Sequence, residues 1–430
     1  MILLGAGASV PFGIPAMYDF TLQFERGLNS DEKRFVEAIK ESLQKSNSTI
    51  GFHLTYDLET LMAFLSDVSE ERSSKPISVV TANHLVYNKL NIYDVKKRDR
   101  DLAKRILTSL KYLILKKCMY PIDFGIRERT FMFLDKFYRP LLSILNGAKL
   151  PDFNIRTRFY NVQRVFSTNW DVCFKYWVNQ CTQFNLSDGT KLGKDGNPLF
   201  DLTDVSKRLE NRPPEADRTF VHLPLHGSLD LIKSTMPKGY GQTTLIYKIP
   251  DIHSYYKSEE NLKNMLIAYP FEAIGYNEAV KSPFLDLLYL LRETMQRENF
   301  LFIIGYSLRD PSVGSVIEEV LSNKCSNGKI FPLSSNIKER YKEANKSSFK
   351  TVIFTKDANK LYKKLEEMDY EMLSQTFFPV EIEFPRVLDT DSNIVNPKFE
   401  TEYTSVLEKI LAELKQIKLV PENTELSNFL

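Results

Sequence analysis

Two glycines near the start of the chain, in the stretch GAGASVPFGIP, have the type and spacing of a phosphate-binding turn. Gly5 and Gly7 follow the short apolar run Ile2–Leu4. Glycines after a strand let the backbone turn tightly and approach a diphosphate, which the backbone amides and the start of the next helix attract. The pattern predicts a dinucleotide site, although a tight turn after a buried strand explains the same two glycines.

The residues after this pair argue against hydride transfer. The usual dinucleotide fingerprint has a third glycine where this chain has Val10, and no acidic residue ends a second strand about 20 residues later. These two departures from the fingerprint therefore disfavour a dehydrogenase.

Three later motifs also carry polar side chains after apolar runs. STNWD contains Asn169 and Asp171, LHGS contains His226, and IIGYSLRDP contains Gly305 and Ser307. Each has a plainer explanation as well. Asn and Asp often hydrogen-bond their own backbone in turns, a histidine beside an apolar strand is commonly structural, and a proline ends many sharp turns.

The elements that would position these residues alternate between strand and helix. Strands are predicted at residues 2–4, 162–169, 219–227 and 299–305, while the loop-like composition of LSDGTKLGKDGNP separates the middle two. Such alternation predicts an α/β fold with a Rossmann-like parallel sheet. All four motifs would then lie at the carboxyl ends of strands, where open α/β sheets bind ligands.

Two regions interrupt or follow this pattern. From about 31 to 140 the apolar periodicity is helical, which predicts a helical insertion in a domain spanning 1–335. Residues 336–430 are predicted to form an accessory region for oligomerisation or partner contact, with a strand at 350–355, a helix at 358–368 and an extended segment at 377–385.

Composition narrows the class of protein. The 430 residues include 57 Lys and Arg against 55 Asp and Glu, so the net charge is close to zero. The protein therefore has no overall positive potential that would attract nucleic acid, and no direct nucleic-acid binding is predicted. The four cysteines form no Cys-x-x-Cys pair, so no metal is expected. No apolar run is long enough to span a bilayer and no signal peptide is seen. We expect a cytoplasmic protein without a membrane segment.

Taken together and in order, the four motifs resemble those of sirtuin-like proteins. That family carries Gly-Ala-Gly-x-Ser-x-x-x-Gly-Ile-Pro at its first strand, and this chain has Gly5, Ala6, Gly7, Ser9, Gly13, Ile14 and Pro15 in the same order. STNWD resembles the family's Thr-Gln-Asn-Ile-Asp, LHGS its His-Gly element, and GYS its adenosine-side Gly-x-Ser. The resemblance covers roughly residues 1–335.

The resemblance implies NAD+ as substrate and a role for each matching residue. Cleaving the nicotinamide–ribose bond passes through an oxocarbenium-like state, which needs electrostatic support and a placed nucleophile. Asn169 would hold a water or the ribose hydroxyls, and His226 would act as general base. Asp171 would orient the nicotinamide, the first motif would line the diphosphate, and Gly305 and Ser307 would line the adenosine.

Departures from the family decide which activity is expected. Neither the zinc-binding cysteine pairs nor the Phe-Gly-Glu strand of deacetylating sirtuins is present in the sequence. Water is then the natural acceptor, so we expect an NAD+ hydrolase (NADase) that releases nicotinamide and ADP-ribose.

The GYSLRDP motif and the helical insertion resemble bacterial antiphage-defence effectors, which act by NAD+ depletion in abortive infection. That resemblance implies a homo-oligomer, or control by a HerA-type partner ATPase or another defence sensor. An NAD-dependent protein deacylase and a catalytically silent nucleotide-binding scaffold remain as alternatives.

Overall fold

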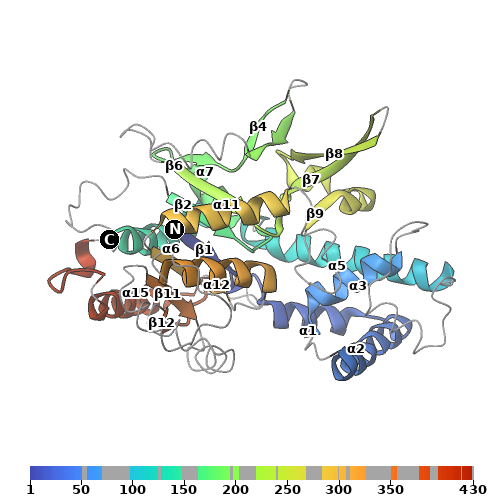
Figure 1. Cartoon of the computed structure of the whole chain (residues 1–430), viewed down its shortest axis with the longest axis horizontal. Helices are drawn as coiled ribbons and strands as arrows, with labels where there is room; N and C mark the ends of the chain where they lie inside the picture. Colours follow the sequence, from blue (N-terminus) through green and yellow to red (C-terminus); the bar gives the residue numbers. More distant parts are fainter. Residues whose placement is uncertain are drawn as a thin grey trace.

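The fold is an α/β arrangement of two sheets and their covering helices (Figure 1). It is seen in a computed structural model. The described residues are 1–50, 56–69, 97–123, 127–147, 163–193, 197–202, 219–238, 241–267, 283–298, 300–306, 310–325, 350–355, 377–387, 396–417 and 419–428.

The main sheet has seven parallel strands in the order β12-β11-β10-β1-β2-β6-β3. The predicted parallel, Rossmann-like sheet is thereby confirmed. Its strands are β1 (Ile2–Leu4), β2 (Gln163–Ser167), β3 (Asn185–Ser187), β6 (Thr219–Pro224), β10 (Phe300–Ile304), β11 (Lys350–Thr355) and β12 (Phe377–Glu381).

The three-residue strand β1 lies at the centre of this sheet, between β2 and β10. Ile2 and Leu4 face one hydrophobic core, and Leu3 faces the other. All three are buried, which explains the continuous apolar run, because a parallel strand covered on both faces has no polar side.

Helices cover both faces of the sheet. The core that contains Leu3 is closed by α11 (Phe284–Arg297) and α12 (Pro311–Cys325). The other core is closed mainly by α1 (Met17–Gly27), α6 (Arg127–Gly147), α7 (Cys173–Gln180) and α15 (Phe399–Gln416).

The predicted helical insertion corresponds to a series of helices between β1 and β2. After α1 come α2 (Ser30–Ile50), α3 (Leu58–Ser69), α5 (Lys97–Asp123) and α6. On α5, the apolar residues Leu102, Ile106, Leu110 and Ile114 are buried, as their helical spacing predicts.

A second, antiparallel sheet was not predicted. Its order is β4-β5-β8-β7-β9, formed by β4 (Thr190–Leu192), β5 (Pro198–Phe200), β7 (Gly227–Lys238), β8 (Gly241–Lys248) and β9 (Met265–Ile267). The single strand predicted at 219–227 is therefore wrong at its end, since β6 stops at Pro224 and a new strand starts at Gly227. The segment read as a loop, residues 186–198, also contains the end of β3 and all of β4.

Part of the predicted accessory region continues the main sheet. Strands β11 and β12 pair in parallel beyond β10, and α15 packs against α6. The backbone amide of Val387 donates to the carbonyl of Pro11 (2.7 Å), and the Tyr403 hydroxyl donates to the carbonyl of Phe137 (2.5 Å). The helix predicted at 358–368 lies outside the described residues.

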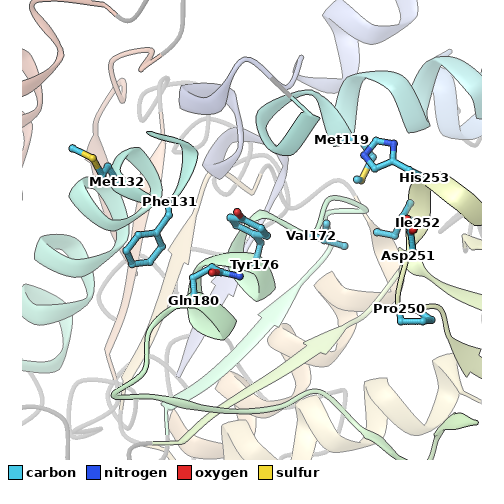
Figure 2. Close-up of a pocket in the computed structure, with 10 residues that line it drawn as sticks. All are labelled: Met119, Phe131, Met132, Val172, Tyr176, Gln180, Pro250, Asp251, Ile252 and His253. Atoms are coloured by element: carbon cyan, nitrogen blue, oxygen red, sulfur yellow. The ribbon is translucent and has the colours of Figure 1, made fainter. Parts of the chain in front are cut away.

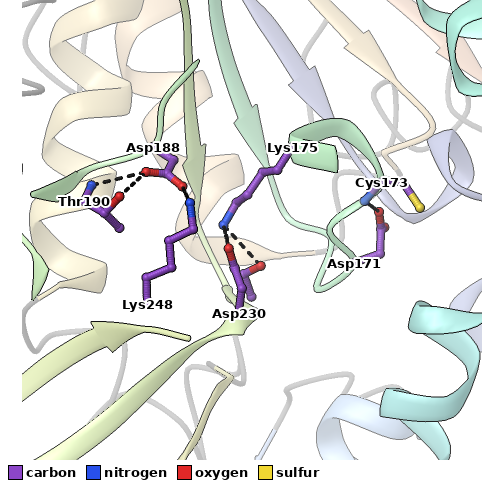
Figure 3. Close-up of polar contacts among 8 residues, drawn as sticks. Asp171, Cys173, Lys175, Asp188, Thr190, Asp230 and Lys248 are labelled. Atoms are coloured by element: carbon purple, nitrogen blue, oxygen red, sulfur yellow. Dashed lines mark hydrogen bonds and ion pairs between the residues drawn. The ribbon is translucent and has the colours of Figure 1, made fainter. Parts of the chain in front are cut away.

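Two ion pairs, one buried and one partly buried, join α7 and the β3–β4 turn to the second sheet (Figure 3). Lys175 on α7 lies 2.7 Å from Asp230 Oδ1 on β7, and Asp188 lies 2.5 Å from the Lys248 ammonium on β8. Burial opposes ionisation of Asp188, but Lys175 and Lys248 lower its pKa to about 2. These charges are tolerated in the interior because each has an opposite neighbour.

Removing one member of the inner pair is expected to destabilise the fold strongly. Lys175→Met leaves the Asp230 carboxylate buried without its cation, which costs roughly 3–5 kcal/mol of unfolding free energy. Lys191→Met, at a half-exposed pair with Asp201, is the control and should cost under about 1 kcal/mol. Urea unfolding measures both. Equal losses of unfolding free energy in the two variants would contradict a buried ion pair at Lys175. A double variant, Lys175→Met/Asp230→Leu, that regains the lost stability would support it.

The low pKa of Asp188 predicts a loss of stability in acid. Its ionised form stabilises the fold fully above pH 4, and this contribution of about 2 kcal/mol disappears as pH falls from its ordinary pKa toward 2. Urea midpoints measured from pH 7 to 2 should therefore fall less in Asp188→Asn than in the parent. Parallel curves for the two proteins would exclude this role.

Candidate active site

Backbone hydrogen bonds bring the four sequence motifs to one edge of the main sheet. The Gly5 amide donates to the carbonyl of Ile304, that of Thr168 to Leu4, and that of Leu225 to Ser167, over 2.7–2.9 Å. Each bond links the end of one strand to the residue that follows its neighbour. The segments after β1, β2, β6 and β10 therefore lie side by side, as the sequence predicts for a parallel sheet.

Three glycines allow the segments after β1 and β10 to touch through their backbones. A Cβ added at Gly5 would lie 2.5 Å from Tyr306 Cα, and one at Gly7 would lie 2.8 Å from Gly305 Cα. Gly305 itself has φ +64°, and its Cβ would meet the Ala8 nitrogen at 2.3 Å. No other residue type fits these positions without moving the backbone.

Several amides of the first motif donate within the protein rather than outward. Gly7 donates to the carbonyl of Gly305, Ala8 to Gly5 and Ser9 to Ala6, at 2.8–3.1 Å. The predicted diphosphate-lining role of this motif would thus have to come from other groups of the loop.

The remainder of the motif shapes the turn. Gly13, with φ 81°, ends a short 3₁₀ turn over Val10–Phe12, Ile14 is buried, and Pro15 is half-buried.

Ser9, Asn169 and Asp171 form one hydrogen-bonded group. The Ser9 hydroxyl donates to Asp171 Oδ2 (2.6 Å) and accepts from Asn169 Nδ2 (2.8 Å). Asp171 Oδ1 accepts from the amide of Cys173 at the start of α7 (3.0 Å), and burial raises the pKa of Asp171. The structure therefore joins residues from two motifs that are 160 positions apart.

Asn169 keeps one polar atom for a further contact. Its Oδ1 is buried and has no hydrogen-bond partner within the described part of the chain. A buried carbonyl oxygen without a partner is unfavourable, and such atoms commonly meet a ligand or water. The indole Nε1 of the next residue, Trp170, is also buried and has no hydrogen-bond partner among the described residues.

His226 lies at the junction of β6 and β7, held by a tight turn. Gly227 has φ 84°, and a Cβ there would lie 2.0 Å from the carbonyl oxygen of Leu266, so only glycine lets β9 approach. The imidazole is buried, and its Nε2 lies 2.6 Å from Asp310 Oδ2. Its Nδ1 has no hydrogen-bond partner among the described residues and lies 4.0 Å from Glu59 Oε1.

Asp310 was not identified from the sequence as a site residue. Its other oxygen, Oδ1, accepts from the amides of Ser312 and Val313 and so caps α12. Burial alone would lower the pKa of His226, but Asp310 raises it above its ordinary value, and Glu59 and the backbone of Thr168 add to this. Ser307, predicted to line the adenosine, lies outside the described residues.

A pocket of about 740 Å³ lies along α7 (Figure 2). Its lining includes Val172, the residue that follows Asp171. Its lining is mostly apolar and aromatic: Met119, Phe131, Met132, Val172, Tyr176, Gln180, Pro250, Asp251, Ile252 and His253. The predicted site residues that the structure describes do not line this pocket.

The described part of the chain offers neither a metal cluster nor a membrane-spanning helix. It contains no cluster of three His, Cys, Asp or Glu side chains able to hold a metal ion, and no helix with the length and apolar character of a membrane span. Comparison of the full sequence with protein-family models and with curated proteins finds no match.

The glycine contacts lead to a direct test of how the site is held together. Gly5→Ala forces the segments after β1 and β10 apart and should cost about 2–3 kcal/mol of unfolding free energy. The control is Gly314→Ala within α12, where an added Cβ meets nothing within 4 Å and should stabilise by about 0.5–1 kcal/mol. Denaturant unfolding of both variants measures this. Opposite signs are expected, and similar values would contradict the close approach.

Proposed function

We propose that this chain is a sirtuin-like NAD+ hydrolase that cleaves NAD+ to nicotinamide and ADP-ribose. The observation that carries the proposal is the meeting of Ser9, Asn169 and Asp171 in one hydrogen-bonded group, at the same sheet edge as the carboxylate-bound His226. The motif resemblance supplies the identity of the substrate. The geometry supports it because the matched residues lie where an open α/β sheet binds a nucleotide.

The proposed reaction breaks the bond between the ribose C1′ and the nicotinamide nitrogen. The electron pair of that bond leaves with nicotinamide, which becomes neutral, and a water oxygen bonds to C1′. The water's proton goes to His226, which later returns it to solvent. NAD+ and water thus give ADP-ribose, nicotinamide and one proton.

The protein groups suit these steps. Nε2 of His226 is engaged by Asp310, which leaves Nδ1 as the nitrogen able to accept a proton in the neutral form. Asp310 fixes the ring and stabilises the imidazolium that results, as a carboxylate does in other acid–base pairs. The unpartnered Asn169 Oδ1 would accept a hydrogen bond from water or a ribose hydroxyl.

Asp171 has the environment of a carboxyl that contacts an amide. Asp171 is buried with no cation beside it among the described residues, and burial raises its pKa, in contrast to Asp230 beside Lys175, whose pKa is lowered. Such a carboxyl is suited to hydrogen-bonding the nicotinamide carboxamide. The wider role, in which NAD+ depletion serves antiphage defence under the control of an oligomer or partner ATPase, rests on the motif resemblance alone.

Two substitutions test the proposed roles. Asn169→Ala and His226→Gln should each reduce nicotinamide release by roughly 10²–10⁴-fold, because they remove the positioning amide and the base. His226→Gln retains an amide that can hydrogen-bond Asp310, so the fold should survive. The assay measures nicotinamide and ADP-ribose by chromatography, with thermal melts to confirm folding.

The same assay tests matched control variants and the two alternative functions. Asn185→Ala and His253→Ala change exposed residues of the same types and should leave turnover unchanged. Turnover that persists in both site variants would refute these roles. Release that requires an added acyl-lysine peptide would identify a deacylase, and binding of NAD+ without consumption would identify a silent scaffold.

A further inference from the structure

A second carboxylate reaches His226 from the helical insertion. Glu59, the second residue of α3, places Oε1 4.0 Å from His226 Nδ1, on the side of the ring opposite Asp310. We propose that Glu59 is a positioning residue of the same site, which holds the imidazole between two carboxylates and makes the insertion a part of the catalytic unit. This inference rests on the proposed function for its chemical meaning, but not for its geometry.

The start of α3 is built to hold Glu59 in place. The buried side chain of Asp57 accepts from the amide and the hydroxyl of Thr60, which caps the helix. Leu58 and Leu61 are fully buried on either side of Glu59, and α3 packs against α5. The carboxylate is therefore carried by a fixed helical turn rather than by a loose loop, and its side chain is only 15% exposed.

Asp310 and Glu59 both raise the pKa values of two buried groups, His226 and Tyr306. His226 faces Asp310 from the start of α12 and Glu59 from α3. Burial raises the pKa of the buried Tyr306, which follows β10, well above its usual value, and the charges of Asp310 and Glu59 raise it further. Tyr306 Oη has no hydrogen-bond partner among the described residues.

This arrangement has a chemical consequence for the base. A carboxylate near Nδ1 favours the protonated ring, so it makes His226 a stronger base while reducing the neutral fraction at a given pH. The same negative charge favours an oxocarbenium-like cation. In addition, His226 Nδ1 and Glu59 Oε1 are 4.0 Å apart. One water molecule could therefore hydrogen-bond both atoms, with an angle of about 90° at the water oxygen.

The first experiment measures the titration of His226 itself, without any substrate. Ring nitrogens of ¹⁵N-histidine protein are followed by NMR from pH 5 to 9, and the His226→Gln spectrum assigns the signal. Glu59→Gln should lower the pKa of His226 by about one unit. Glu59→Ala, which leaves no amide to hydrogen-bond, should lower it similarly, whereas Glu37→Gln on the exposed face of α2 should not change it.

The second experiment measures nicotinamide release against pH in the same variants. Because the base must be neutral, activity rises as pH passes through the pKa of His226, and this acidic limb should move down by about one pH unit in Glu59→Gln. Glu37→Gln should keep the parent profile. Both Glu59 variants are checked for folding by thermal melts.

The two measurements separate the failure of each proposal. An unchanged His226 titration in both Glu59 variants, or an equal shift in Glu37→Gln, would overturn the role of Glu59 whatever the enzyme does. A parent protein that never releases nicotinamide would overturn the proposed function, while the titration would still decide whether Glu59 positions His226. A shifted titration with an unshifted rate profile would show that Glu59 contacts a ring that is not the base.

Discussion

The candidate site depends on one constraint: the segments after β1 and β10 must touch through their backbones. Gly5 and Gly7 meet Gly305 and Tyr306 at distances that leave no space for a Cβ. This contact brings Ser9 onto Asn169 and Asp171 from one direction. From the other, it carries the chain from Gly305 toward Asp310, which meets His226. The glycines thus assemble the site by permitting a close approach, in addition to any contact with a ligand.

Three buried aspartates, Asp171, Asp188 and Asp230, differ in their neighbours. Asp188 and Asp230 have lysine partners, and their pKa values are lowered, so they remain charged and join the second sheet to α7 and the β3–β4 turn. Asp171 accepts from a hydroxyl and a backbone amide, has no cation beside it in the described part of the chain, and has a raised pKa. The first arrangement stabilises a fixed architecture. The second leaves a carboxyl whose protonation can respond to what binds beside it.

The sequence predicted the parts of the fold that are encoded locally. Apolar runs ending in Gly, Asn or His identified β1, β2, β6 and β10, and their alternation with helices predicted that these ends would meet. The second sheet was missed because short strands such as β4 lie in a Gly- and Asp-rich segment that is typical of loops. Glu59 and Asp310 were missed for a different reason: their partner, His226, is 167 and 84 positions away, and no local pattern marks such pairing. A signal for Asp310 did exist, since Asp before Pro at a helix start is typical of a cap.

The position of β1 has a consequence for how the protein is made. This strand is synthesised before its neighbours β2 and β10, which follow about 160 and 300 residues later. Contacts so distant in sequence form slowly, and the central strand stays unpaired until those later strands emerge from the ribosome. The loop after β1 also hydrogen-bonds Val387, beyond β12. Any activity carried by this sheet edge would therefore appear only once translation has passed β12 and Val387, and chains that stop earlier would be inactive.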